Sequence, residues 1–358
     1  MKMKHRYIDI NVMLIILNNI NIFKIIIFIY KIMSQEEKKV FNKDKLIEYD
    51  LVLDMLSLST LVYNFNIDIK SESTKNNKYD LKNLNIENLK VDSKRKELLK
   101  QILEKSPNCE LYKFYDLQSG SQVGITISHK QKRISFIFRG SNQLIDWIHD
   151  FMICKKEISE NICVHLGFYK SLFKENLFNN LLEDLKKLIE EHPEYDLYIT
   201  GHSLGAGLTT LFGYLISDII DKNITLITFA SLRVGNKEWC EDFNKKKNLR
   251  HFRFVNEKDI ATIFPYLYFY HVGNCILINK NNSMNYTKYD EHNDKSNIFY
   301  YFNPIDHLID NYYNNLLICK WDNNNIYCEN YTSSSNAKNI SEENIELTEK
   351  KAPQNELI

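Results

Sequence analysis

A glycine-rich turn near the middle of the chain constrains the fold more than any other feature. The segment Gly201–Gly207, with the sequence GHSLGAG, follows a strand-like run that ends at Thr200 and opens a run of apolar residues at helical spacing. A tight strand-to-helix turn brings two backbones together, so its flanking positions must carry almost no side chain. Gly201 and Gly205 meet this requirement, and we expect the Ser203 hydroxyl to stand clear of the sheet.

Strand-like and helix-like segments alternate through the central region. The runs with strand character are Val123–Ser128, Ile134–Phe138, Leu197–Thr200, Leu226–Ala230 and Phe252–Val255. The runs with helical spacing are Tyr169–Glu191 and Ser203–Ile220. This alternation predicts an α/β fold with a central, mostly parallel sheet flanked by helices. A first packed helix is expected from Asp44, as N-cap, to about Tyr63.

Both ends of the chain differ in composition from this region. Residues 1–43 are expected to form a hydrophobic N-terminal extension. Its stretch Val12–Ile32 is long enough to cross a hydrocarbon core but carries three asparagines and Lys24 near its middle. A non-native start and a signal anchor are equally favoured readings, ahead of a cleaved signal. Residues 44–330 are expected to form one domain, and 331–358, without apolar periodicity, a disordered tail.

Charge and cysteine content exclude several function classes. Forty-six basic and 46 acidic residues cancel to a formal net charge of zero, which argues against a nucleic-acid partner. The seven cysteines include no CxxC pair, so neither a zinc ribbon nor a disulfide scaffold is indicated, and reduced thiols are expected. An apolar fraction of 44% is enough for a sizeable core.

A serine at such a turn acts as a nucleophile only if the chain also supplies a base and an acid. In this type of fold the order along the chain is serine, acid, histidine. Asp259 follows the strand-like run Phe252–Val255, and a carboxyl group just past a strand lies at the edge of the sheet where α/β proteins place their sites. Asp259 is therefore the predicted acid, with Glu257 in the same turn as its rival.

Three histidines follow the predicted acid and are candidates for the base. His307 lies 48 residues past Asp259, near the start of a predicted helix, and is favoured. His271 lies within an apolar and aromatic run and is expected to be a buried structural histidine. His292 lies in a polar insertion. The residues alone leave all three open.

Several blocks, in order, resemble the class 3 lipases, the family of the filamentous-fungal triacylglycerol lipases. The blocks are Phe138–Ser141, His192–Gly207, Arg233–Asn236, Asp259–Pro265 and His307–Leu308. The resemblance covers roughly Asp44 to Leu317 and implies an α/β-hydrolase fold. It implies Ser203 as nucleophile, Asp259 as acid and His307 as base. It also implies an oxyanion hole formed by Ser141 and the Leu204 N–H.

Other segments bear on substrate choice. Ser231–Leu232 stands where the family usually has a small residue and proline, and Asn279–Ile298 is an enlarged polar insertion that leaves specificity open. The segment after the oxyanion loop carries an apolar helical face, made of Leu144, Trp147, Ile148 and Phe151. Most amphipathic faces are permanently packed on the core, and the family resemblance places a lid on an equal footing with that reading.

The expected function is hydrolysis of lipid esters of the triacylglycerol type by a serine lipase or carboxylesterase, through an acyl-enzyme. A phospholipase A1 or monoacylglycerol-type lipase is the alternative enzyme, and a catalytically silent lipid-binding homologue is the alternative from another class. No metal or organic cofactor is expected. The expected partner is a lipid ester at a membrane or lipid-droplet surface. A cytoplasmic or membrane-associated location is favoured over a secreted one, and the oligomeric state is left open.

Overall fold

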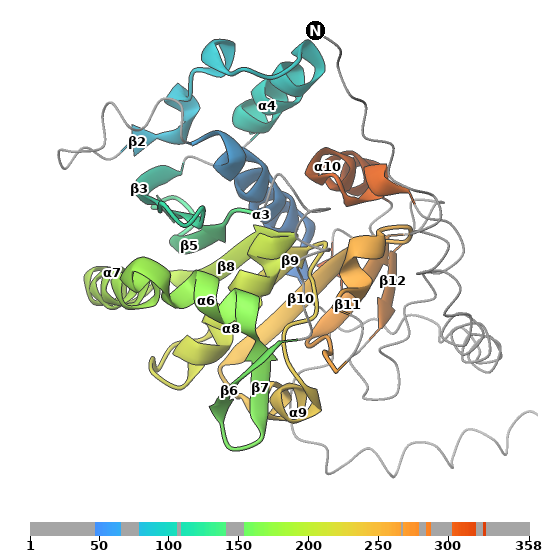
Figure 1. Cartoon of the computed structure of the whole chain (residues 1–358). Helices are drawn as coiled ribbons and strands as arrows, with labels where there is room; N and C mark the ends of the chain where they lie inside the picture. The colour runs from blue at the N-terminus through green and yellow to red at the C-terminus, as the bar shows by residue number, and fades with distance from the viewer. Residues whose placement is uncertain are drawn as a thin grey trace, which may run out of the picture.

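The computed structural model describes residues 47–65, 79–105, 109–140, 154–265, 268–278, 284–287, 303–319 and 325–326. The described strands of the main sheet run in the order β12-β11-β10-β9-β8-β5-β4-β3-β2 (Figure 1). Their bounds are β2 Tyr79–Asp80, β3 Glu110–Asp116, β4 Gln122–Ser128, β5 Arg133–Phe138, β8 Asp196–His202, β9 Ile224–Phe229, β10 Leu249–Asn256, β11 Asn274–Ile278 and β12 Met284–Thr287.

The middle of this sheet is parallel and its two ends are antiparallel. Strands β5, β8, β9, β10 and β11 pair in parallel, whereas β12 at one end and β4, β3 and β2 at the other pair antiparallel. The predicted α/β-hydrolase fold, with a mostly parallel sheet between helices, is confirmed. The carboxyl ends of β5, β8 and β10 lie at one edge, where Ser203 and Asp259 follow their strands.

Helices cover both faces of the sheet. The described helices are α3 Tyr49–Leu61, α4 Ser93–Lys105, α6 Leu166–Phe173, α7 Leu177–Glu191, α8 Leu204–Ser217, α9 Lys237–Lys245 and α10 Ile309–Ile318. Side chains of β5 alternate between two cores: Phe136 and Phe138 pack with α6, α7 and α8, and Ile137 packs with α3 and α10. No helix among the described residues combines the length and apolar character needed to cross a membrane.

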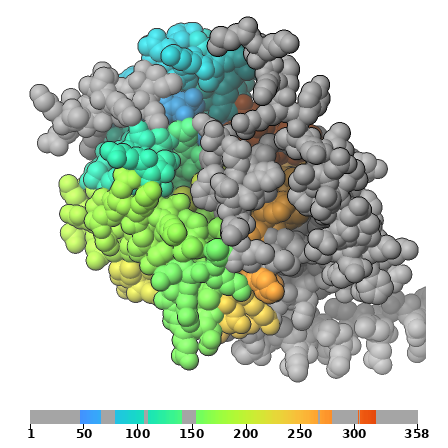
Figure 2. All heavy atoms as spheres, viewed as in Figure 1, coloured from blue at the N-terminus to red at the C-terminus, as the bar shows by residue number. Residues whose placement is uncertain are grey.

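Two short ribbons lie outside the main sheet. Strand β1 (Ile47–Glu48) pairs antiparallel with β13 (Asn325–Ile326), and β6 (Lys155–Ser159) pairs antiparallel with β7 (Ile162–His165). The β6–β7 hairpin projects from the lower edge of the molecule (Figure 2). The first ribbon joins the two ends of the described chain, so both ends of the domain meet beside α3.

The N-terminal helices hold the segment that carries His307. The Tyr49 hydroxyl donates a hydrogen bond to the Leu316 carbonyl of α10 at 3.2 Å, and Arg95 of α4 forms an ion pair with Asp310. Because Asp310 is only three residues past His307, these contacts help to hold the segment that carries His307 against the rest of the fold.

Two helix boundaries differ from the sequence expectation. Helix α3 begins at Tyr49 with Glu48 as N-cap, and Asp44 lies outside the described residues. The helix expected over Tyr169–Glu191 is two helices, α6 and α7, separated by the 3₁₀ turn η5 (Lys174–Asn176).

The break in this predicted helix has a tertiary cause. Glu175 and Asn176 have φ of 51° and 60°, which no α-helix allows. The Glu175 carboxylate accepts hydrogen bonds from the backbone N–H groups of Gln118 and Ser119, at 3.2 and 2.8 Å. The break is therefore fixed by hydrogen bonds to a loop 56 residues earlier in the chain. The spacing of apolar residues within the segment itself cannot predict such a contact.

Parts of the predicted organisation lie outside the described residues. These are the N-terminal extension 1–43 and the tail 331–358, so the domain boundaries stay predictions. Within the polar insertion Asn279–Ile298, residues 284–287 form β12, which adds an antiparallel strand to β11. That part of the insertion extends the sheet.

Candidate active site

Ser203 occupies a strained turn between β8 and α8. Its φ of 59° and ψ of −123° lie in a region that residues with a side chain rarely adopt. A Cβ atom on Gly201 would lie 2.6 Å from the backbone of Gly205, and one on Gly205 would collide with the Phe138 carbonyl. The two glycines therefore permit β5, β8 and α8 to meet at the serine, as the sequence predicts.

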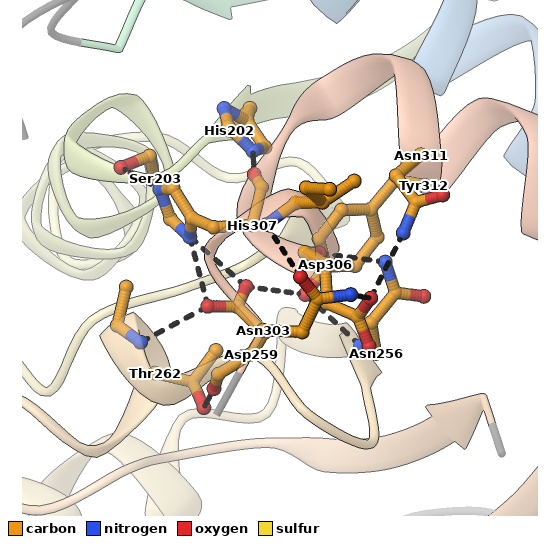
Figure 3. A network of polar contacts seen from close by, with 12 residues as sticks. His202, Ser203, Asn256, Asp259, Thr262, Asn303, Asp306, His307, Asn311 and Tyr312 are labelled. Carbon is orange, nitrogen blue, oxygen red and sulfur yellow. Dashed lines mark hydrogen bonds and ion pairs between the residues drawn. The ribbon is translucent and has the colours of Figure 1, made fainter. Parts of the chain in front are cut away.

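His307 lies directly against the Ser203 side chain. It ends the 3₁₀ turn η8 (Pro304–His307), whose N-cap Asn303 accepts a hydrogen bond from the Ile305 N–H. The distance from His307 Nε2 to Ser203 Oγ is 2.9 Å, and His307 Nδ1 lies 2.9 and 3.0 Å from the two Asp259 oxygens (Figure 3). Since the carboxylate accepts, Nδ1 carries the proton and Nε2 is free to accept from the serine hydroxyl.

Asp259 is fully buried and held by donors from two elements. It follows β10 and caps η6 (Ile260–Ile263), where its Oδ1 accepts from the Ala261 N–H at 3.0 Å. Its Oδ2 accepts from the Tyr312 hydroxyl of α10 at 2.8 Å. The rival Glu257 donates its backbone N–H to the Ile278 carbonyl at 2.9 Å, and both His307 Nδ1 contacts go to Asp259.

Tyr312 also belongs to this site and was not predicted from the sequence. Its hydroxyl lies between the Asp259 carboxylate and the Asn256 N–H, which donates to it at 3.0 Å. Burial and the neighbouring Asp259 raise the pKa of Tyr312 well above its usual value, so the hydroxyl keeps its proton and donates it. An aromatic residue five positions after His307 was the available signal, but helical spacing alone also fits a core residue.

Of the other two candidate bases, His271 is buried and His292 lies outside the described residues. His271 Nε2 donates to the Thr262 carbonyl at 2.7 Å. Burial and the positive charges of Arg253 and Arg233 lower the pKa of His271 well below its usual value, so the ring is neutral. This is the environment that the sequence predicts for a structural histidine.

The predicted oxyanion hole is described in part. Leu204 begins α8, and the first N–H groups of a helix lack partners within the helix and can bind an anion. A Cβ atom on Gly140 would lie 2.6 Å from the His202 carbonyl, so the chain just before Ser141 touches the serine turn. Ser141 itself and the possible lid residues Leu144, Trp147, Ile148 and Phe151 lie outside the described residues.

The family model for class 3 lipases matches residues 135–269, which include the Ser203 turn and Asp259. Over these residues the chain is similar to the class 3 lipases, in agreement with the sequence blocks that resemble this family. His307 lies beyond the matched stretch, so its place in the site rests on the contacts described above.

Two curated proteins that match this chain carry different names. A secreted mono- and diacylglycerol lipase A from Penicillium cyclopium is 28% identical over 159 residues, which are 44% of this chain and 51% of the relative. Phospholipase A1-II 1 from Oryza sativa subsp. indica is 30% identical over 168 residues, which are 41% of this chain and 43% of the relative. The chain spans about half the length of the curated relatives it matches.

Solved structures support the fold over a longer stretch. The triacylglyceride lipase of Rhizomucor miehei superposes with a TM-score of 0.59 at 19% identity, covering 72% of this chain and 92% of that structure. The mono- and diacylglycerol lipase variant from Penicillium cyclopium superposes with a TM-score of 0.58 at 19% identity, covering 72% and 93%. At this identity the likeness concerns the fold.

The part of the chain that the structure describes holds neither a cluster of metal ligands nor a disulfide. There, His, Cys, Asp and Glu side chains form no group of three or more able to hold a metal ion. The six cysteines described, Cys109, Cys154, Cys163, Cys240, Cys275 and Cys319, are free.

Proposed function

We propose that this chain belongs to the class 3 lipases and hydrolyses lipid esters through an acyl-enzyme on Ser203. The observation that carries the proposal is the unbroken chain of hydrogen bonds from Ser203 Oγ through His307 to Asp259, at 2.9 Å on each side of the imidazole. A hydroxyl, an imidazole and a carboxyl group in this order activate a serine for attack on an ester carbonyl.

The reaction follows from the atoms of this chain. As Oγ bonds to the ester carbon, its proton passes to His307 Nε2, and Asp259 stabilises the positive charge that forms on the ring. The carbonyl oxygen becomes an anion, which we assign to the Leu204 N–H and Ser141. His307 then protonates the departing alcohol, leaving an acyl-enzyme. Water, deprotonated by the same Nε2, attacks the acyl carbon and releases the fatty acid and Ser203.

The substrate class rests on the family, and the particular ester is open. The relatives above are named for mono- and diacylglycerols and for phospholipids, and the Rhizomucor miehei neighbour for triacylglycerides. We propose a triacylglycerol-type ester at a membrane or lipid-droplet surface. Phospholipase A1 and monoacylglycerol lipase activities are the alternatives, because a serine triad fixes acyl transfer but not the leaving group.

Ser203→Ala tests the proposal directly. We expect kcat on a soluble nitrophenyl ester to fall by roughly 10³-fold or more, since the triad acts as a unit. Labelling by a fluorophosphonate should disappear, while the melting temperature stays near that of the wild type. Ser217→Ala is the matched control, because Ser217 is a buried serine at the far end of α8 that donates to the Tyr214 carbonyl.

Near-wild-type turnover by Ser203→Ala would reject Ser203 as the nucleophile. A wild-type protein that neither labels nor turns over ester would instead favour a silent lipid-binding homologue. A panel of triacylglycerol, monoacylglycerol and phospholipid substrates then assigns the leaving group.

A further inference from the structure

His202, the residue before the proposed nucleophile, makes hydrogen bonds with both ring nitrogens. Its Nε2 lies 2.7 Å from the main-chain oxygen of His307, a contact between residues 105 positions apart (Figure 3). A carbonyl oxygen only accepts, so Nε2 carries the proton. Burial and the nearby His307 lower the pKa of His202 well below its usual value, so the ring is neutral and Nδ1 is left as an acceptor.

Tyr63 supplies the donor for that acceptor. It lies in the 3₁₀ turn η1 (Val62–Asn64) that follows α3, and its hydroxyl is 3.1 Å from His202 Nδ1. Burial raises the pKa of Tyr63 to about 12, so the hydroxyl keeps its proton. Donation by Tyr63 selects the His202 tautomer in which Nε2 faces His307 with its hydrogen.

The Tyr63 oxygen also contacts the segment that leads to the predicted oxyanion loop. It accepts from the Gly140 backbone N–H, and a Cβ atom on Gly140 would collide with it. The Arg139 guanidinium lies over the Tyr63 ring, 5.2 Å from its centroid. One hydroxyl group therefore bridges the residue before Ser141 and the histidine before Ser203.

We propose that His202 and Tyr63 are positioning residues for the reaction proposed above, on which this inference rests. Tyr63 sets the tautomer of His202, and the His202 Nε2–H holds the main chain of His307 so that its imidazole stays between Ser203 and Asp259. Because His202 and Ser203 are adjacent at the end of β8, this bond ties the proposed base to the same piece of backbone that carries the nucleophile.

Burial alone does not explain a histidine at this position. His202 is 5% exposed, and an imidazole at that depth costs free energy unless both nitrogens are paired. Here both partners come from distant segments, η1 and η8, and one of them is the main chain of the proposed base. An apolar ring would fill the space but would leave the His307 carbonyl without this donor.

The test compares His202→Phe, His202→Gln and Tyr63→Phe, with kcat and KM measured on a soluble nitrophenyl ester per fluorophosphonate-reactive site. Since a small misplacement of a reacting group costs about tenfold to a hundredfold in rate, His202→Phe should lose that much in kcat with KM within about twofold. His202→Gln should recover most of the loss, because its amide N–H can reach the same carbonyl. Tyr63→Phe should lose roughly threefold to tenfold in kcat, because it removes the contribution of about one neutral hydrogen bond.

Two controls match these variants in residue type and burial. His251→Gln changes another buried neutral histidine, bonded to Thr228 at 2.7 Å, and Tyr214→Phe removes another hydroxyl, bonded to Asp242 at 2.7 Å. Both should keep kcat per reactive site within about twofold.

Two outcomes would overturn the inference. One is wild-type kcat in both His202→Phe and Tyr63→Phe while Ser203→Ala is inactive, which leaves the proposed function intact. The other is a His202→Gln variant as impaired per reactive site as His202→Phe, because the N–H donor would then not be the cause. If His202→Phe does not fold, Tyr63→Phe still decides, since it removes a single oxygen atom. Absence of labelling in the wild type would overturn the proposed function.

Discussion

Two buried histidines, His307 and His271, contact residues in or next to the short helix η6, and they meet different partners. His307 contacts the Asp259 carboxylate and the Ser203 hydroxyl, whereas His271 contacts the Thr262 main-chain carbonyl. They are similarly buried, at 8% and 4% exposed. The comparison shows that burial does not make a histidine a base. A histidine base needs a hydrogen-bond acceptor for the N–H of one ring nitrogen and a nucleophile hydroxyl within reach of the other ring nitrogen.

The electrostatic surroundings of the two histidines differ as much as their partners. Arg253 and Arg233 lie near His271 and add to the effect of burial in lowering its pKa. Beside His307, the partner is instead a fully buried carboxyl group whose oxygens also accept from the Tyr312 hydroxyl and the Ala261 N–H. A positive charge is therefore disfavoured at His271, whereas the His307 ring lies against a carboxyl group.

The largest expected effect separates these histidines directly. His307→Ala should lower kcat on a soluble ester by roughly 10³-fold or more, because the triad works as a unit. His271→Ala should lower the melting temperature but keep kcat per reactive site within a few-fold. His292→Ala serves as a further comparison for the histidine in the polar insertion. The assignment of the base is wrong if His271→Ala or His292→Ala inactivates and His307→Ala is tolerated.

Much of the fold could be predicted from the sequence because its strands are local features. Runs of β-branched and aromatic residues located β4, β5, β8, β9 and β10 to within a few residues. Strand β3, next to the edge strand β2, was missed, since its sequence ELYKFYD carries three charged residues and also suits a loop. The break at η5 depends on a contact with a distant loop, which no window of the sequence contains.

The candidate site divides in the same way. The Ser203 turn requires small neighbouring residues, which the local sequence shows. Once the turn is recognised, this type of fold sets the order of serine, acid and histidine along the chain, so Ser203, Asp259 and His307 could be proposed from the sequence. Tyr312, Tyr63 and His202 could not, because each acts through a partner more than 50 residues away. The sequence pattern of a tyrosine on an apolar helical face is the same whether its hydroxyl contacts water, the backbone or a carboxylate.

A smaller effect concerns access, which only the proposed active site requires. Ser203 is 1% exposed, so an ester reaches it only if neighbouring groups move. If Leu144, Trp147, Ile148 and Phe151 form a lid that turns towards lipid, burying Trp147 in the lipid surface stabilises the open form. Trp147→Asp should then lose roughly tenfold more activity on emulsified substrate than on a soluble ester.

Equal losses on the two substrates, with a lowered melting temperature, would contradict the lid. A charge at a permanently packed position destabilises the whole domain and reduces both activities together. The apolar face at residues 144–151 would then belong to the core, and the protein would be an esterase without interfacial gating.

The smallest effect is on stability and concerns the histidines outside the proposed triad. Burial lowers the pKa of His251 from 6.5 to about 3, and the values for His271 and His202 are lowered too. Below pH 6.5 the unfolded chain takes up protons at these positions and the folded chain does not, so the free energy of unfolding falls as the pH is lowered towards 3. Each such histidine contributes at most about 1.4 kcal/mol per pH unit in this window.

His251→Gln isolates one of these contributions. The free energy of unfolding, measured by urea titration between pH 5.0 and 6.5, should depend less steeply on pH in the variant, by up to about one proton. Its absolute stability falls as well, because the bond to Thr228 is altered, so the slope is the informative quantity. Ser217→Ala changes no titrating group and should keep the wild-type slope. A variant slope equal to that of the wild type would mean that His251 takes up its proton in the folded protein, and burial would then not keep this histidine neutral.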